Sequence, residues 1–259
     1  MENFKFVDGR FVSQAFTCEC GREHVVPIQE ILVRHGAIDE AGEVLDRLHV
    51  GKHGLIIADL NTYAAAAEKL VNVLQTSSYT TKLCLFNTRE IVKPNEQALG
   101  KVLLNIDRET AFVVAVGSGC LTDLTRYISV RTGIPFISVA AAPSMDGYAS
   151  PVASMWHEGC KKTVPATYPQ AIIADVDVIC QAPYPMIAAG FGDLVGKLNS
   201  RVDWELSRIV TGEYYCDRVV ELIDTSVKAC IDNVVKIRNR EPEVLTHLTE
   251  GLILSGVGM

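Results

Sequence analysis

A regular alternation of short apolar segments with helical patterns is the feature that most constrains the fold. Five segments bounded by turn-forming residues have the composition of buried strands: 24–33, 53–60, 81–86, 111–116 and 135–140. Apolar residues recur at helical spacing between them, over 38–48, 62–76, 95–106 and 121–132. Strands that alternate with helices pair in parallel through right-handed crossovers. We therefore predict an α/β layered domain with a parallel sheet.

The pattern changes near residue 182. A last strand-like segment covers 171–179, and helical patterns then cover 184–198, 201–210, 214–238 and 242 to the end of the chain. This change predicts two domains, an α/β domain over residues 1–182 and an all-helical domain over residues 183–259.

Charge and composition exclude several classes of protein. The 259 residues include 24 basic and 31 acidic side chains, a formal net charge of -7, so we expect no nucleic-acid partner. The first residues have no apolar signal segment, and no charge-free stretch is long enough to span a bilayer. Eight cysteines are mostly scattered singly through apolar segments, which suits reduced thiols. We predict a cytoplasmic protein without membrane insertion.

One group of cysteines resembles half of a zinc site. Cys18 and Cys20 are followed by His24, but a structural zinc site needs four ligands and no second cysteine pair lies nearby in the sequence. We interpret the segment as a turn with small buried thiols, with a metal half-site as the alternative.

The predicted strand 111–116 leads directly into Gly117-Ser118-Gly119 and then into a helix. In a parallel α/β sheet this position presents free amides and the positive end of a helix dipole, and glycines let a phosphate approach the backbone. The turn predicts a binding site for the pyrophosphate of a dinucleotide. The third glycine of the usual fingerprint is missing, because Leu121-Thr122 stands there, so an ordinary tight turn is the alternative.

Three acidic residues stand at positions that could serve a ligand. Asp59 ends the segment 53–60, where a carboxylate can accept hydrogen bonds from an adenosine ribose, although it precedes the glycine turn instead of following it. Asp146 lies in 140–155, which we predict to be a ligand-approaching loop or a plain connector. Asp193 lies in the apolar middle of the glycine-containing helix 184–198, where a cation must meet it, either Lys197 or a metal.

Four motifs in order carry a resemblance to a known family. The combination VGSG-x3-D, SMDGYASPVA, KKTVPATYPQAIIADVDVI and AAGFGDLVGK resembles the sn-glycerol-1-phosphate dehydrogenases of the iron-containing alcohol dehydrogenase superfamily, which also holds glycerol dehydrogenase and 3-dehydroquinate synthase. The resemblance runs through essentially the whole chain. It implies a nucleotide-binding domain followed by a helical domain, with a divalent metal and the substrate in the cleft between them.

The resemblance also implies roles for individual residues. Asp59 would meet the adenosine ribose of NAD(H) or NADP(H), and Asp193 would ligate the metal and touch the substrate, which Asp146 would also hold. The pyrophosphate would meet the turn formed by Gly117, Gly119, Cys120, Leu121, Thr122 and Asp123, and the rest of the cofactor site would be lined by Ala141, Ala142, Pro143, Ser144 and Ser150.

The implied reaction is the reduction of dihydroxyacetone phosphate, a small phosphorylated substrate, with zinc, nickel or iron as Lewis acid on its carbonyl. In this family two later histidines complete the metal site, whereas the only histidine after Asp193 here is His247, and the helical pattern stops at Met259. We therefore expect a helical domain and a metal site that are incomplete in this chain, with His157 at the surface. A homo-oligomer is possible.

Two alternatives to this enzyme stay open. One is a nucleotide-binding protein without catalysis, and the other is a polyol oxidoreductase like glycerol dehydrogenase. Asp193 argues against 3-dehydroquinate synthase, whose first metal ligand is a glutamate.

Overall fold

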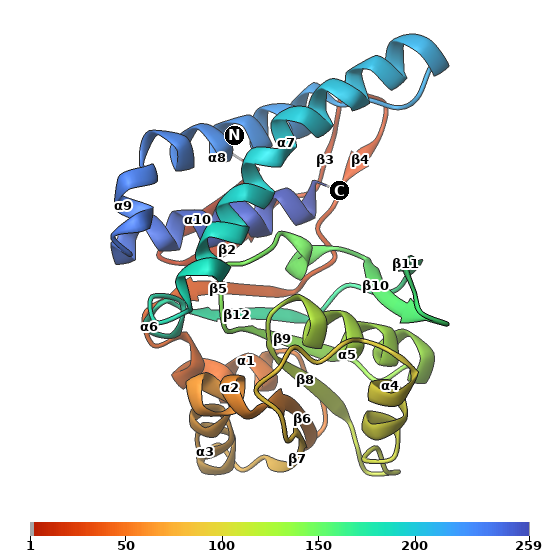
Figure 1. The fold of residues 1–259 in the computed structure, drawn as a ribbon, viewed down its shortest axis with the longest axis vertical. Helices are drawn as coiled ribbons and strands as arrows, with labels where there is room; N and C mark the ends of the chain where they lie inside the picture. Colours follow the sequence, from red (N-terminus) through yellow and green to blue (C-terminus); the bar gives the residue numbers. More distant parts are fainter. Residues whose placement is uncertain (1–2, 259) are drawn as a thin grey trace.

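An eight-stranded sheet forms the centre of the molecule (Figure 1). The computed structural model describes residues 3–258. The strands lie in the order β1 (Phe4–Val7), β2 (Arg10–Ser13), β5 (Glu30–Arg34), β12 (Ala171–Asp175), β9 (Phe136–Ala140), β8 (Phe112–Gly117), β6 (His53–Asp59) and β7 (Thr80–Phe86). From β5 to β7 all neighbours are parallel, and β1 and β2 add an antiparallel edge. The predicted α/β fold with a parallel sheet is confirmed.

Helices cover both faces of the sheet. One face packs against η1 (Ala37–Glu40), α1 (Ala41–Arg47) and α3 (Glu68–Thr76), the last continuing from α2 (Leu60–Thr62) and the π-helical turn η2 (Tyr63–Ala67). The other face packs against α4 (Glu96–Leu103) and α5 (Gly119–Thr132) over β6 to β9. In β5, Leu32 faces the first layer while Ile31 and Val33 face the second. This alternation explains why the strand is apolar throughout.

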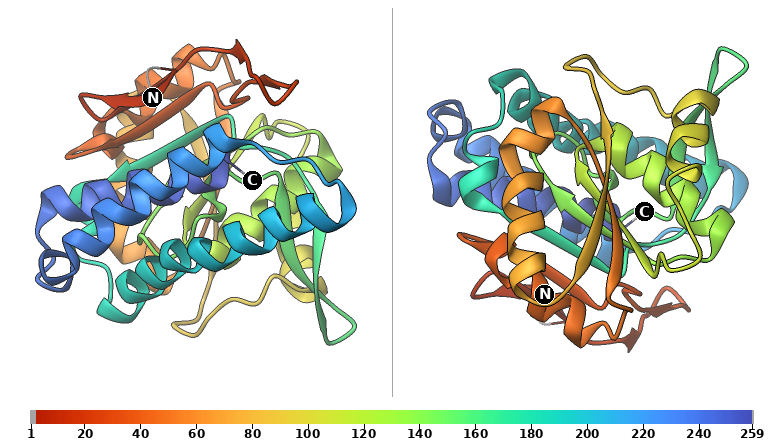
Figure 2. Two further views of the ribbon diagram at one scale, coloured as in Figure 1. Left: turned by 90° about the horizontal axis from the view of Figure 1, so that it is seen from above. Right: turned by 90° about the horizontal axis from the view of Figure 1, so that it is seen from below.

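The remainder of the second face, over β5 and β12, is covered by C-terminal helices (Figures 1 and 2). These are α7 (Tyr184–Thr211), α8 (Asp217–Asp232), α9 (Val234–Arg238) and α10 (Pro242–Val257), preceded by the short α6 (Val176–Ile179). Leu248 and Leu252 of α10 share a buried cluster with Val33 and Ile172 of the sheet. The change from strands to helices falls where the sequence predicts it. One apolar core continues from the sheet into the C-terminal helices, so the domain boundary near residue 182 stays a prediction.

Several predicted elements differ in extent. The segment 24–33 contains only the end of β4 (Glu23–His24) and β5, with no regular structure over 25–29, and 171–179 divides into β12 and α6. The helices predicted at 184–198 and 201–210 form the single helix α7, while 214–238 divides into α8 and α9.

Some strands are missing from the sequence interpretation. The loop predicted over 140–155 ends in β10 (Val152–His157), which pairs with β11 (Cys160–Pro165) as a hairpin. His157 lies on this hairpin, exposed, and contacts Glu96. Near the N-terminus, β3 (Phe16–Thr17) pairs with β4. Ala153 and Met155 of β10 are buried, whereas β11 is largely polar and exposed, and β3 and β4 have only two residues each, too few to show an alternation.

The lengths of the helices bear on membrane insertion and on the end of the described chain. In residues 3–258 no helix combines the length and the apolar character that crossing a bilayer requires. Helix α10 ends at Val257, and Met259, where the helical pattern stops in the sequence, lies outside the described residues.

Candidate functional site

The glycine turn and Asp59 meet at a reversal in strand order. Gly117 ends β8 and Asp59 ends β6, and these two strands are parallel neighbours, with Ile57 opposite Ala115. After β6 the chain moves outward to β7 and then returns to β8 on the opposite side of β6. Ligands of open α/β sheets bind at the carboxyl edge where such a reversal leaves a crevice. The topology thus brings both predicted residues to the position that suits a dinucleotide.

The first turn of α5 presents free amides at this edge. The hydroxyl of Ser118 accepts the Gly119 amide at 2.6 Å, and the Ser118 carbonyl accepts the Thr122 amide at 3.0 Å. Among residues 3–258 this leaves the amides of Cys120 and Leu121 without a partner. Together with the helix dipole, these amides are suited to bind one phosphate oxygen or more.

The two glycines of the turn are needed for different reasons. A Cβ on Gly117 would lie 2.7 Å from the Leu121 Cδ1, so a side chain there would displace the buried Leu121. A Cβ on Gly119 would make only an ordinary contact, 3.4 Å from the Met145 sulfur. Packing therefore leaves Gly119 free to serve the approach of a ligand.

The carboxylate of Asp123 already has a partner within the chain. Its Oδ1 accepts a hydrogen bond from the Arg126 guanidinium at 3.0 Å. Burial raises the pKa of Asp123 to about 6, and the charge of Arg126 opposes this shift only in part. A carboxylate in this position repels a pyrophosphate, which favours the amides of the turn as its ligands.

The segment 141–150 is held against the glycine turn by hydrogen bonds, and its role in binding a ligand stays a prediction. The Tyr148 hydroxyl donates toward the carbonyls of Ala142, at 2.8 Å, and Gly117, at 3.2 Å. The Ser118 and Ser144 hydroxyls lie 2.7 Å apart, and the Ala141 amide donates to the Gly117 carbonyl at 3.0 Å. The predicted cofactor residues Ala141, Ala142, Pro143 and Ser150 are buried beside them.

Arg126 holds the same segment from the other side. This fully buried guanidinium donates to the carbonyls of Gly147, of Tyr148 at 3.0 Å and of Val152 at 2.9 Å. Sequence reasoning missed Arg126 and Tyr148. The sequence signal available for Arg126 was an arginine among the apolar positions of a predicted helix. No sequence signal marked Tyr148.

Asp59 has a structural role of its own. Its Oδ1 accepts the amides of Asn61 at 2.9 Å and Thr62 at 2.8 Å, while the Thr62 hydroxyl accepts the Asp59 amide at 3.0 Å. This reciprocal pair is a capping box that starts α2. Among the described residues no hydrogen bond is made to Oδ2, so the predicted ribose contact stays available to that oxygen.

Asp146 and Asp193 lie together, as their predicted roles require. The Asp193 carboxylate accepts the Asp146 amide at 2.8 Å, and the Asp146 carboxylate accepts the Ser255 hydroxyl at 3.1 Å. Lys197, which the sequence places one turn after Asp193, forms an ion pair with Asp146. Burial, and then the charge of Asp146, raises the pKa of Asp193.

Two glycines bring the C-terminal helices against this segment. A Cβ on Gly190 of α7 would lie 1.9 Å from the Pro143 carbonyl oxygen, and a Cβ on Gly256 of α10 would lie 2.3 Å from that of Asp146. The backbone of 141–149 therefore touches both helices. The apparent cost of Gly190 inside a helix is explained by this close approach.

The ion that the family resemblance implies has an insufficient set of ligands here. A catalytic zinc-type site uses three protein ligands. Within residues 3–258 no group of three or more histidine, cysteine or acidic side chains surrounds Asp193. The described residues alone do not fit this ion.

A pocket of about 730 Å³ lies between the N-terminal turn and helices α7 and α8. Its wall includes Lys197, the partner of Asp146, together with Arg22 and Arg201. Lys197 joins this pocket to the Asp146–Asp193 pair. Three acidic residues, Glu23, Glu213 and Asp224, also line the pocket, and Asp224 forms an ion pair with Arg201.

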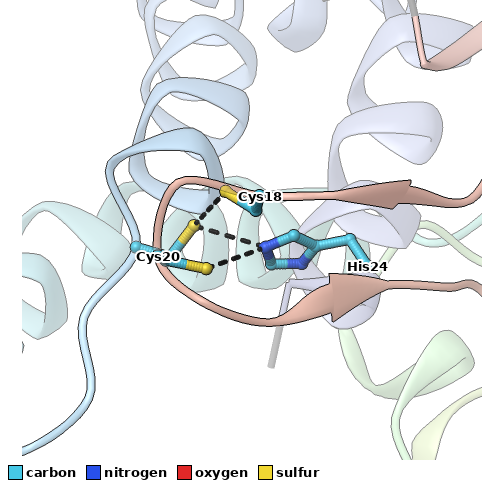
Figure 3. A group of neighbouring side chains, drawn as sticks. Cys18, Cys20 and His24 are labelled. Carbon is cyan, nitrogen blue, oxygen red and sulfur yellow. Dashed lines mark hydrogen bonds between the residues drawn. The ribbon is translucent and has the colours of Figure 1, made fainter.

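The cysteine turn gains a neighbour in the folded chain. Cys18, Cys20 and His24 point toward one another across the β3–β4 turn (Figure 3). A fourth residue, Cys216 in the segment between α7 and α8, joins them, and the four potential ligand atoms all lie within 4.8 Å of one another. The segment is a turn with free thiols, as the sequence predicts, and the metal half-site stays the alternative, to which the fold adds Cys216 from a distant part of the chain.

Known proteins of similar sequence point to one family. Residues 32–183 match the model of the iron-containing alcohol dehydrogenase family. A glycerol-1-phosphate dehydrogenase (NAD(P)+) of Geobacillus thermodenitrificans is 37% identical over 96% of this chain, and one of Methanosarcina mazei is 32% identical over 89%. The chain spans 62% and 64% of the length of these two relatives.

Solved structures show the same fold at low identity. Glycerol dehydrogenase from Schizosaccharomyces pombe superimposes with a TM-score of 0.77 at 18% identity, over 91% of this chain and 62% of that one. An iron-containing alcohol dehydrogenase from Thermotoga maritima gives a TM-score of 0.74 at 16% identity, over 91% and 68%. By the match over residues 32–183, this chain belongs to the iron-containing alcohol dehydrogenase family.

Proposed function

We propose that this chain forms the cofactor-binding and Asp193-bearing part of an NAD(P)H-dependent enzyme that reduces dihydroxyacetone phosphate to sn-glycerol 1-phosphate. The relatives' names support this reaction. The observation that carries the proposal is the glycine turn, whose free amides at Cys120 and Leu121 lie at the strand-order reversal beside Asp59. The segment 141–150 links this turn to the pair Asp146 and Asp193.

In this proposal the chain positions two ligands against each other. The amides of the α5 turn bind the cofactor pyrophosphate, and the bound nicotinamide supplies hydride to the substrate carbonyl. Arg22 and Lys197 are the cationic residues of the pocket lining that we assign to the substrate phosphate, whereas Arg201 is held by Asp224. The Asp146 amide fixes the Asp193 carboxylate, and the Asp146 carboxylate pairs with Lys197, which lines the pocket.

The cofactor site is tested by titrating NADH and following its fluorescence. Replacing Gly119 with valine places a side chain over the free amides, so we expect NADH binding to weaken by at least about tenfold with little change in thermal stability. Gly100→Val is the matched control, because nothing lies within 4 Å of a Cβ at that half-buried helical position. An unchanged affinity in Gly119→Val would remove the turn from the cofactor site.

The reaction is tested with an NADH oxidation assay on dihydroxyacetone phosphate and on unphosphorylated dihydroxyacetone. The assay compares this chain with a form extended by the histidine-bearing segment that the family resemblance implies. We expect the extended form to reduce the phosphorylated ketone and to lose that activity in Asp193→Ala. A preference for dihydroxyacetone would favour a polyol oxidoreductase, and NADH binding without turnover in either form would favour a non-catalytic nucleotide-binding protein.

A further inference from the structure

We propose that Cys18, Cys20, His24 and Cys216 form a structural zinc site. The site is independent of Asp193, which lies on α7 and shares no ligand with it. Cys18 and Cys216 are buried, Cys20 and His24 are half-buried, and their four ligand atoms lie within 4.8 Å of one another. Figure 3 shows Cys18, Cys20 and His24 pointing toward one another.

The distances between the ligand atoms match a tetrahedron around one zinc ion. Zinc–sulfur bonds of about 2.3 Å and zinc–nitrogen bonds of about 2.0 Å give sulfur–sulfur edges of roughly 3.8 Å and sulfur–nitrogen edges of roughly 3.5 Å. The Cys18 and Cys216 sulfurs lie 3.8 Å apart. The His24 Nε2 lies 3.4 Å from the Cys20 sulfur and 3.5 Å from the Cys216 sulfur. Three edges of the ligand set therefore have the lengths that a bound ion requires.

The local backbone is shaped to aim these side chains at a common centre. The amide of Cys18 donates to the Arg22 carbonyl at 2.9 Å, and the amide of Gly21 donates to the Cys18 carbonyl at 3.0 Å. Gly21 has a φ of +83°, which favours glycine and reverses the chain directly after Cys20. The reversal returns His24 to the strand opposite the one that leads into Cys18.

Neighbouring side chains orient the ligands, as the hydrogen-bond partners of metal ligands do in metal sites. The Tyr214 hydroxyl lies 3.3 Å from the Cys20 sulfur, where it can donate a hydrogen bond to a thiolate. Arg22 lies 3.5 Å above the centre of the Tyr214 ring, and Phe16 stacks on the His24 ring with centroids 5.1 Å apart. These contacts fix the orientation of two of the four ligands.

Four protein ligands close the coordination sphere, which is the arrangement of structural and not catalytic zinc. The ion would join the N-terminal turn to the segment that connects α7 and α8. Arg22 and His24 on one side and Tyr214 on the other line the 730 Å³ pocket, so the same ion would fix two walls of that pocket relative to each other.

Metal analysis of the chain purified under reducing conditions, without added chelator, tests the proposal directly. We expect one equivalent of zinc per chain to survive dialysis. Replacement by cobalt should give the visible absorption bands of tetrahedral cobalt with a thiolate charge-transfer band in the near ultraviolet. This spectrum is recorded on the unmodified chain, so it does not depend on whether a variant folds.

Variants assign the ligands. Cys216→Ser and His24→Ala should lose the zinc, whereas Cys160→Ser should retain it, because Cys160 is exposed on the β10–β11 hairpin. Asp193→Asn should also retain the zinc, which separates this site from the ion that the proposed function implies. Chelation should lower the thermal midpoint of the unmodified chain and leave that of Cys216→Ser unchanged.

Three results would overturn the proposal. The first is a reduced chain that takes up neither zinc nor cobalt at equimolar concentration. The second is a Cys216→Ser variant with undiminished zinc. The third is a disulfide between Cys18 and Cys216 in the chain as isolated from reducing cytosol, found by mass spectrometry of non-reduced peptides.

Discussion

At the scale of single residues, Arg126 is the side chain on which the site most depends. It supplies hydrogen bonds to three backbone carbonyls and an ion pair to Asp123 from a fully buried position. Arg126→Met should lower the free energy of unfolding by about 3–5 kcal/mol, because buried acceptors and a buried carboxyl lose their partner. Urea denaturation measures the loss. Arg131→Met, an exposed arginine of the same helix, should change stability by less than about 0.5 kcal/mol.

Asp123 gives the stability a pH dependence. Its pKa is raised to about 6 in the folded chain, mainly by burial, so folding favours the protonated carboxyl. The stabilisation that this group contributes is complete below its unfolded pKa and is lost as the pH rises through about 6. Asp123→Asn should therefore gain stability relative to the unmodified chain between about pH 4 and about pH 7. A stability difference that is constant over this range would contradict the shift.

At the scale of elements, the glycines of α7 should respond in opposite directions to the same substitution. Gly190→Ala would place a Cβ against the Pro143 carbonyl, and we expect it to destabilise the chain by about 1–3 kcal/mol. Nothing lies within 4 Å of a Cβ on Gly192, so Gly192→Ala should stabilise the helix by about 0.5–1 kcal/mol. Chemical denaturation of the two variants side by side measures both. Equal changes in the free energy of unfolding for the two variants would show that α7 does not pack closely against the segment 141–149.

Elements also show what the sequence could and could not predict. The parallel strands and the turn before α5 are marked by apolar runs and glycines, so local pattern was sufficient to place them. Strand β11 is largely polar and exposed, so its pairing with β10 has little local signal. Helix α7 continues through Asn199 and Ser200, where the pattern weakens. The metal-type cluster needs Cys216, whose proximity to Cys18 is a product of the tertiary fold and has no local signature.

At the scale of the whole molecule, apolar side chains remain exposed on the last turns of α7. Val202, Leu206, Ile209 and Val210 are each more than half exposed. Apolar surface of this kind favours association, so we expect sedimentation velocity to show self-association that increases with concentration. Leu206→Gln combined with Ile209→Gln should reduce it. A chain that stays monomeric at all concentrations would contradict this expectation.

The pairing of β5 with β12 has a consequence for how the protein is made. Residues 30–34 pair in register with residues 171–175, so the ribosome must deliver most of the chain before β5 acquires the parallel partner on its inner side. Until then the apolar Ile31, Leu32 and Val33 have only the N-terminal strands beside them. Strands β6, β7, β8 and β9 pair with one another, and only β9 also pairs with β12. These four strands can therefore assemble earlier during synthesis. The nascent chain should therefore protect β5 from hydrogen exchange only after β12 has left the ribosomal tunnel.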